Sequence, residues 1–224
     1  MTFPPVLLVH GLASSFAHNW RAAGWTDILR DEGREVLGVD LPGHGTSAAV
    51  DPAAVPAADA VLAALGEHPV IDAVGFSAGG QALLAAAAAA PHRFRRLAVL
   101  GVGNPPSAAA GEATDRLADG LASADAPAHP VTRLIRRLAD TAGNDRHAVA
   151  ADLRAQRRTP LAELAAVTAP VLVVLGDKDF AAPADLLLDA LPDARLVTLR
   201  GVDHFGTPLS YDAIAAVTGF LAGP

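Results

Sequence analysis

One serine, Ser77, lies within the sequence Gly-Phe-Ser-Ala-Gly that spans residues 75–79. The apolar run before it, residues 70–74, is typical of a buried strand, and the alanine-rich run 81–90 is typical of a helix. A serine between such a strand and such a helix indicates a nucleophile elbow, in which the flanking glycines allow close backbone approach. Unpaired N–H groups at the helix N-terminus would stabilise an oxyanion formed when Ser77 attacks a carbonyl. The segment therefore predicts a nucleophile for acyl transfer.

A serine hydroxyl is a weak nucleophile at neutral pH, so it needs an imidazole to accept its proton and a carboxylate to orient that imidazole. Of the eight histidines, only His204 follows the fifth predicted strand. Two aspartates that follow that strand directly, Asp177 and Asp179, are candidates for the carboxylate, and Asp203 is the neighbour of His204. The histidines show no His-x-x-x-His spacing, so the sequence predicts no zinc site.

Six apolar runs have the length of strands and are nearly continuous rather than alternating, which is typical of strands covered by helices on both faces. They are residues 6–9, 36–39, 70–74, 97–100, 171–175 and 195–199. Helical patterns lie between them, at residues 20–30, 59–65, 81–90, 183–190 and 211–221. The sequence thus predicts one α/β domain over residues 1–224, with a doubly wound, mostly parallel sheet of about six strands. Ligands bind such sheets beyond the carboxyl ends of the strands, where the polar motifs fall.

Residues 104–168 interrupt the alternation of strands and helices. This stretch contains the helical runs 132–139 and 146–156 without a clear strand between them. We expect a helical cap inserted over Ser77, where it would shape the substrate pocket and limit water. An ordinary pair of surface helices is an equally compatible interpretation.

Composition excludes several classes of function. The net charge of −7 disfavours binding to nucleic acid or to anionic membranes. Cysteine is absent, which excludes disulfides, thiolate metal sites and a cysteine nucleophile. The N-terminal residues lack the basic and long apolar segments of a signal peptide or a membrane span, so we expect a cytoplasmic protein. Nothing in the sequence indicates an oligomeric state.

The order of these motifs resembles that of the α/β-hydrolase superfamily over essentially the whole chain. The resemblance implies that Ser77 is the nucleophile and that His204 acts first as general base and then as general acid. It also implies that Asp179 is the orienting carboxylate, because it matches the last residue of the G-x-x-D signature after the penultimate strand. Asp177 remains the main alternative, and turn stabilisation is the simpler role for Asp177 and for Asp203.

The same resemblance assigns the oxyanion hole to two backbone N–H groups, those of Leu12 and Ala78. Residues 40–45 resemble the D-x-P-G-x-G turn of the superfamily, so we assign no chemistry to His44. Two departures from the pattern matter. The two strands that often precede the His-Gly loop are missing, which leaves a six-stranded sheet, and the nucleophile is serine rather than the aspartate of haloalkane dehalogenases and epoxide hydrolases.

The predicted function is a serine hydrolase that cleaves a small or medium carboxylic ester through an acyl-enzyme, with neither metal nor organic cofactor. One alternative is a perhydrolase or cofactor-free haloperoxidase with the same triad, and another is a noncatalytic ligand-binding module on the same fold. The scarcity of cationic residues near the predicted site favours uncharged, apolar substrates. Five residues could line the pocket, although core packing competes with that role: Phe16, Trp20, Asn104, Phe180 and Phe205.

Overall fold

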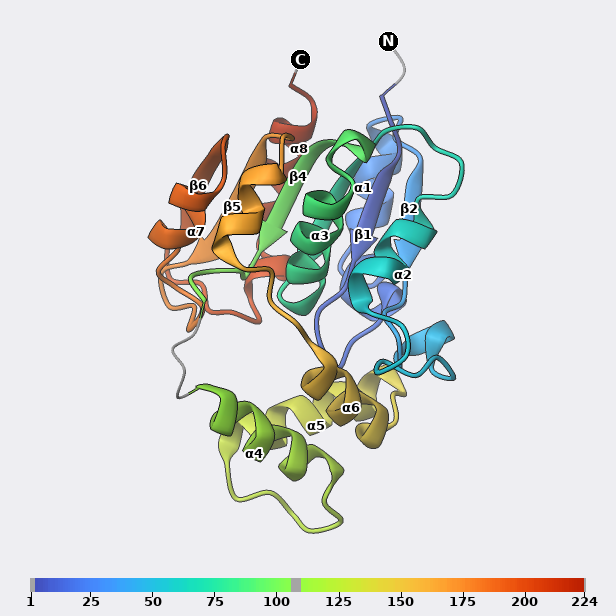
Figure 1. Ribbon diagram of the computed structural model, residues 1–224, viewed down its shortest axis with the longest axis vertical. Helices are drawn as coiled ribbons and strands as arrows, with labels where there is room; N and C mark the ends of the chain where they lie inside the picture. Colours follow the sequence, from blue (N-terminus) through green and yellow to red (C-terminus); the bar gives the residue numbers. More distant parts are fainter. Residues whose placement is uncertain (1–2, 106–109, 224) are drawn as a thin grey trace.

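The structure, a computed structural model, describes residues 3–105 and 110–223. Its centre is a six-stranded sheet with the strand order β2-β1-β3-β4-β5-β6, in which every neighbouring pair is parallel (Figure 1). The strands are β1 (Val6–Val9), β2 (Val36–Val39), β3 (Ile71–Phe76), β4 (Phe94–Leu100), β5 (Val171–Gly176) and β6 (Ala194–Leu199). The predicted α/β fold with a parallel sheet of six strands is thus confirmed.

Helices cover both faces of this sheet. They are α1 (Trp25–Asp31), α2 (Ala57–Ala64), α3 (Ala78–Ala89), α7 (Asp185–Ala190) and α8 (Tyr211–Leu221). Because side chains alternate along a strand, β1 contributes to two separate cores. Leu7 and Val9 belong to the core that includes side chains of α2, α3 and α7, whereas Val6 and Leu8 belong to the core that includes side chains of α1 and α8. Burial on both faces explains why the strands read as continuous apolar runs.

The predicted helix over residues 20–30 is wrong in its extent. The structure divides this region into a π-helical turn, Ala17–Arg21, and α1. The break occurs at Gly24, whose φ of +82° is a left-handed conformation that a helix interior does not accommodate. A continuous periodicity of apolar residues therefore concealed a change of direction.

Between β4 and β5 the chain forms α4 (Ala110–Ala122), α5 (Pro130–Ala142) and α6 (Arg146–Ala155), followed by the 3₁₀ segment Leu161–Ala166. Figure 1 shows α4, α5 and α6 together at the end of the sheet to which β4 points, away from both chain termini. Of the predicted insertion, residues 106–109 lie outside the described residues. A third apolar cluster unites side chains of α4, α5 and α6, and Ala13, from the loop after β1, belongs to it.

Within the described ranges, none of the helices is both long enough and apolar enough to cross a membrane.

Candidate active site

Ser77 lies between the end of β3 and the first residue of α3. Its φ of +52° is a left-handed value that a non-glycine residue rarely adopts, as a sharp turn from strand to helix requires. A Cβ on Gly75 would lie 2.7 Å from the Gly79 carbonyl oxygen, and one on Gly79 would collide with the carbonyl oxygen of His10. The two glycines therefore let α3 start directly over the sheet and against the end of β1, and the turn presents the Ser77 side chain at the carboxyl edge.

The side chains of Ser77, His204 and Asp179 form a continuous hydrogen-bonded row. Nε2 of His204 lies 3.0 Å from Oγ of Ser77, and Nδ1 of His204 lies 2.9 Å from Oδ1 of Asp179. His204 and Asp179 are both buried, each with a relative exposure of 5%. A carboxylate at Nδ1 favours the tautomer with the proton on that nitrogen, so Nε2 is free to accept the serine proton. Residues from three separate loops thus meet at one point.

The other two aspartates near this row have different partners. Oδ1 of Asp177 accepts a hydrogen bond of 2.7 Å from the Gly201 N–H, and Oδ1 of Asp203 accepts one of 2.8 Å from the Gly206 N–H. Both carboxylates therefore stabilise turns, as short side chains in loops commonly do. The geometry brings Asp179, and not Asp177, to His204.

The loop after β1 contains Leu12, one of the two predicted oxyanion donors. Within residues 3–105 and 110–223, neither the N–H of Leu12 nor that of Ala78 donates a hydrogen bond. The neighbouring N–H groups of this loop are occupied: Gly11 donates to Oδ1 of Asn19 at 3.0 Å, and Ala13 donates to Nε2 of His44 at 3.1 Å. The loop is therefore held on both sides of Leu12, while Leu12 itself keeps a free donor.

Two buried histidines anchor this region as neutral rings. Nε2 of His10 accepts from the Leu41 N–H at 3.0 Å, which leaves the proton on Nδ1, 2.8 Å from the Gly11 carbonyl oxygen. His44 is arranged in the same way, because its Nε2 accepts from Ala13 and its Nδ1 lies 3.0 Å from the Pro42 carbonyl oxygen. Burial, together with the adjacent His44, lowers the pKa of His10 to about 4. The neutral state of His10, which its two hydrogen bonds need, is thus the stable one at neutral pH.

Asp40 ties the loop after β1 to the turn after β2. Its Oδ1 accepts from the Phe16 N–H at 2.6 Å, and its Oδ2 accepts from the N–H and the hydroxyl of Thr46, each at 2.8 Å. Burial alone would raise the pKa of Asp40, but these hydrogen bonds outweigh burial and lower it. The carboxylate is therefore ionised at neutral pH and can bind both turns.

Sequence reasoning missed the anchoring role of His10 and His44, and it missed Asn144 entirely. Nδ2 of Asn144, between α5 and α6, donates to the Ser14 carbonyl oxygen at 2.8 Å, and its Oδ1 accepts from the Gly45 N–H at 2.9 Å. For the two histidines, the polar residues beside the His-Gly motif were a local signal of this anchoring role. No local pattern distinguishes Asn144, because its partners come from distant turns.

Comparison with known proteins identifies the family. Residues 6–217 match the sequence pattern of the Alpha/beta hydrolase family. The chain belongs to this family. None of the curated proteins matches it in sequence. Membership agrees with the predicted superfamily and supports a hydrolase activity on a small-molecule substrate.

Solved structures of other α/β hydrolases resemble this one over almost the whole chain. A hydrolase from Pseudomonas aeruginosa PA01 is 25% identical, with a TM-score of 0.75, and the match covers 99% of this chain and 91% of that one. A thermophilic esterase from Thermogutta terrifontis, solved with malate bound, is 25% identical, with a TM-score of 0.77 and coverages of 98% and 90%. An enol-lactonase from Burkholderia xenovorans LB400 is 23% identical, with a TM-score of 0.72 and coverages of 100% and 93%, a likeness that shows the fold alone.

Three aromatic rings surround His204 in this α/β hydrolase. The ring centroid of Phe180 lies 4.2 Å from that of the imidazole, and those of Phe76 and Phe205 lie 5.0 Å and 5.2 Å from it. Phe180 is 72% exposed, so it shields one face of the imidazole while its own outer face meets solvent. Of the predicted pocket residues, Phe180 and Phe205 therefore do lie beside His204.

The other three predicted pocket residues do not lie beside His204. Trp20 is fully buried and packs edge-on against Trp25 in the core, at a centroid distance of 5.2 Å. The ring of Phe16 packs over Gly38 of β2, where a Cβ would collide with it. Oδ1 of Asn104 accepts from two N–H groups in the first turn of α7, at 2.9 and 3.2 Å, so this side chain caps a helix. Aromatic residues near the loop after β1 thus fill the core.

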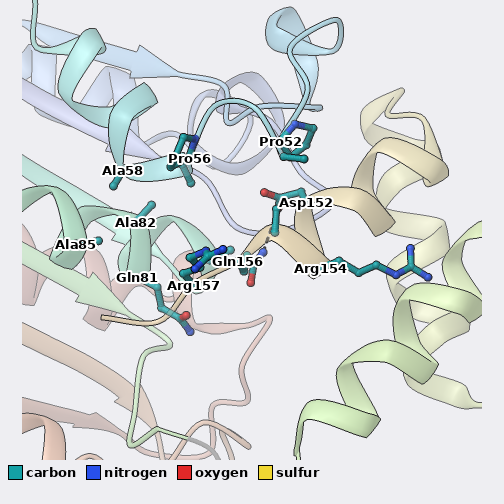
Figure 2. A pocket seen from close by; sticks show the side chains of 14 residues that line it. Pro52, Pro56, Ala58, Gln81, Ala82, Ala85, Asp152, Arg154, Gln156 and Arg157 are labelled. Atoms are coloured by element: carbon teal, nitrogen blue, oxygen red, sulfur yellow. Dashed lines mark hydrogen bonds between the residues drawn. The ribbon is translucent and has the colours of Figure 1, made fainter. Parts of the chain in front are cut away.

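A cavity of about 310 Å³ opens beside the elbow, a volume at the lower end of the range typical of ligand pockets (Figure 2). Ala78, which follows Ser77 directly, forms part of its lining. Small side chains of α3 and the residues around α2 line most of it, and residues from α6 onward complete it. The lining comprises Pro52, Ala53, Pro56, Ala57, Ala58, Ala78, Gln81, Ala82, Ala85, Asp152, Arg154, Ala155, Gln156 and Arg157.

No group of three or more histidine, cysteine or carboxylate side chains within residues 3–105 and 110–223 is arranged to hold a metal ion.

Proposed function

We propose that this α/β hydrolase is a serine esterase that hydrolyses a small or medium carboxylic ester. The observation that carries the proposal is the row of contacts from Oγ of Ser77 to Nε2 of His204, 3.0 Å, and from Nδ1 of His204 to Oδ1 of Asp179, 2.9 Å. The distances and the order of groups match those of a nucleophile, a general base and an orienting carboxylate.

In the first half of the reaction, Oγ of Ser77 attacks the ester carbonyl carbon while Nε2 of His204 takes the hydroxyl proton. Asp179 holds the Nδ1–H and stabilises the imidazolium that forms. The substrate carbonyl oxygen becomes an oxyanion, which the N–H groups of Ala78 and Leu12 stabilise. The positive end of the α3 dipole, directly after Ser77, adds to this effect.

In the second half, the tetrahedral intermediate collapses and the ester C–O bond breaks. The leaving alkoxide takes the proton from Nε2 of His204 and departs as an alcohol, which leaves the acyl group on Ser77. His204 then accepts a proton from a water molecule as that water attacks the acyl carbonyl. Collapse of the second intermediate returns the proton to Oγ of Ser77 and releases the carboxylic acid.

We further propose that residues 104–168 act as the helical cap of a single catalytic domain. The apolar cluster of α4, α5 and α6 includes Ala13, next to the proposed oxyanion donor Leu12, and residues from α6 onward line the cavity beside Ser77. A cap in this place limits access of water to the acyl-enzyme. The esterase from Thermogutta terrifontis, at 25% identity over 98% of this chain, supports ester hydrolysis as the activity.

The test is hydrolysis of 4-nitrophenyl esters by the wild type and by Ser77→Ala. We expect the variant to lose about 10⁴-fold or more in kcat. A fluorophosphonate probe should label the wild type at Ser77, whereas the control Ser210→Ala should keep both labelling and turnover. Hydrolysis by Ser77→Ala at the wild-type rate, or no labelling of well-folded wild-type protein, contradicts the proposal; the second result favours a noncatalytic binding module.

A further inference from the structure

The cavity beside Ser77 has an apolar floor and one cationic edge. Its floor consists of Ala78, Ala82 and Ala85 on α3, and the cationic edge is formed by residues that follow α6. Ala78, which follows Ser77 directly, lines this space, whereas Ser77 and His204 do not. A substrate with its carbonyl carbon at Oγ of Ser77 would pass Ala78 to enter it, and the groups along the edge would then contact the part of the substrate that does not react.

Arg157 is an exposed cationic residue of this edge. It makes neither a hydrogen bond nor an ion pair with any residue in the described part of the chain. Arg154, which also lines the cavity, is paired with Asp119 at 2.5 Å, and Figure 2 shows its side chain extending away from the pocket. In the same segment Arg146 is paired with Asp140 at 2.6 Å. The free guanidinium thus lies at the cavity while these other arginines are neutralised.

Arg158 and Gln81 extend the same cationic edge. Arg158 lines a small adjoining cleft of about 30 Å³, and Gln81 lines both this cleft and the larger cavity. Burial lowers the pKa of Arg158, and no carboxylate offsets that burial among residues 3–105 and 110–223. The Arg158 side chain is exposed at the rim, and a carboxylate bound there would supply the counter-charge that this guanidinium lacks.

We propose that this edge binds a carboxylate on the substrate, so that the preferred substrate is an ester or lactone with one negative charge in its acyl portion. This inference rests on the proposed esterase function and names its substrate class. Gln81 lies four residues beyond Ser77 on α3, a rise of about 6 Å along the helix. The carboxylate carbon should then lie roughly four to five bonds from the reacting carbonyl carbon, because each bond of an extended chain advances about 1.3 Å.

The remaining charged group of the lining, Asp152, limits the charge that the site accepts. Asp152 is buried, and its Oδ2 accepts from Nε2 of Gln156 at 3.0 Å. Burial raises the pKa of Asp152, and its carboxylate repels a dianion such as phosphate more strongly than it repels a monoanionic carboxylate. The expected occupant is therefore a monoanion. This conclusion departs from the uncharged substrate that the sequence alone favoured.

The kinetic test compares two esters that differ only at the end of the acyl chain: mono-4-nitrophenyl glutarate, which has a terminal carboxylate, and 4-nitrophenyl pentanoate, which has a methyl group. For the wild type we expect kcat/KM to be about tenfold higher for the glutarate ester, the size of one charge-assisted hydrogen bond. Arg157→Gln should abolish this preference, because kcat/KM should fall about tenfold for the glutarate ester and by less for the pentanoate ester.

Arg154→Gln is the matched control, because Arg154 belongs to the same lining but is paired with Asp119. It should retain the preference, and Arg158→Gln should reduce it. Equal kcat/KM values for the two esters in the wild type, or a preference that survives in Arg157→Gln, overturn the proposal.

Calorimetry with glutarate provides a measurement that does not depend on turnover. We expect saturable binding to the wild type and to Ser77→Ala, weaker binding to Arg157→Gln, and little competition from inorganic phosphate. Absence of glutarate binding to the wild type overturns the anion site. If only the proposed esterase function is wrong, the protein should still bind glutarate but should neither hydrolyse the pentanoate ester nor react with the probe.

Discussion

The backbone N–H of Ala13 donates a 3.1 Å hydrogen bond to Nε2 of His44, a residue 31 positions later in the chain. Ala13 has a φ of +61°, which a non-glycine residue rarely adopts without support from its surroundings. Because Ala13 follows Leu12, the same bond restrains the Leu12–Ala13 peptide, which adjoins the peptide that bears the Leu12 N–H. A buried histidine in the turn after β2 thus positions a proposed oxyanion donor after β1.

Replacement of His44 by alanine should therefore reduce turnover through the loop after β1. The buried N–H of Ala13 would lose its acceptor, at a cost of about 1–3 kcal/mol. We expect kcat to fall by about 10²-fold, as for loss of one oxyanion donor, with a smaller change in KM. The measurement is steady-state hydrolysis of a 4-nitrophenyl ester. The exposed His18 of the same region provides the control variant His18→Ala, and an equal loss in both variants contradicts the positioning role.

Asp179→Asn should inactivate the enzyme without unfolding it. An amide at this position can leave the proton on the wrong nitrogen of His204, so that Nε2 cannot accept the proton of Ser77. We expect kcat to fall by about 10³- to 10⁴-fold, with thermal unfolding near that of the wild type. Asp177→Asn is the matched control, because Asp177 is exposed and binds the Gly201 N–H. Greater loss in Asp177→Asn than in Asp179→Asn would reverse the assignment of the acid.

Stability should decline in mild acid because of His10. Its pKa is about 4 in the folded protein and 6.5 in the unfolded chain, so the unfolded state binds the proton first as the pH falls. The free energy of unfolding should decrease between pH 6.5 and pH 4, by about 3 kcal/mol from this group. Urea denaturation over pH 4 to 8 measures it, and His10→Asn should show a flatter curve. The titratable groups that face His10 are His44 and Asp40, and both are present in the two proteins. Stability curves of equal slope for the wild type and His10→Asn contradict the prediction.

Asp72→Asn should destabilise the fold strongly while sparing catalysis. Asp72, near the start of β3, is fully buried and pairs with Arg34 and Arg95; its Oδ2 lies 2.6 Å from Nη2 of Arg95. Loss of the carboxylate leaves Arg34, itself 4% exposed, without its counter-charge, at a cost of about 3–5 kcal/mol. Urea unfolding measures the loss, and activity per folded molecule should stay near that of the wild type because Ser77 is at the other end of β3. A loss no greater than that of the surface variant Asp27→Asn contradicts this account.

Much of the fold follows from local sequence patterns. The six apolar runs became the six strands, and residues 211–221 became α8 with the predicted bounds. These elements are predictable because a doubly covered strand or an amphipathic helix requires a particular spacing of apolar residues within a short window. The single helix predicted in the region from Ala17 to Asp31 was wrong, because the left-handed turn at Gly24 divides it but leaves the apolar periodicity unchanged.

The sequence by itself determined the proposed nucleophile, because the elbow of Ser77 is a local structure that small neighbours and a strand–helix boundary specify. Only the tertiary structure decided which aspartate faces His204, that His44 supports Ala13, and that Arg157 lies unpaired at the cavity. It also placed Trp20 in the core and Phe180 against His204. The physical reason is that each of these depends on contacts between loops that are distant in the chain. Which side chains meet at the carboxyl edge of the sheet depends on strand order and loop direction, and short-range patterns specify neither.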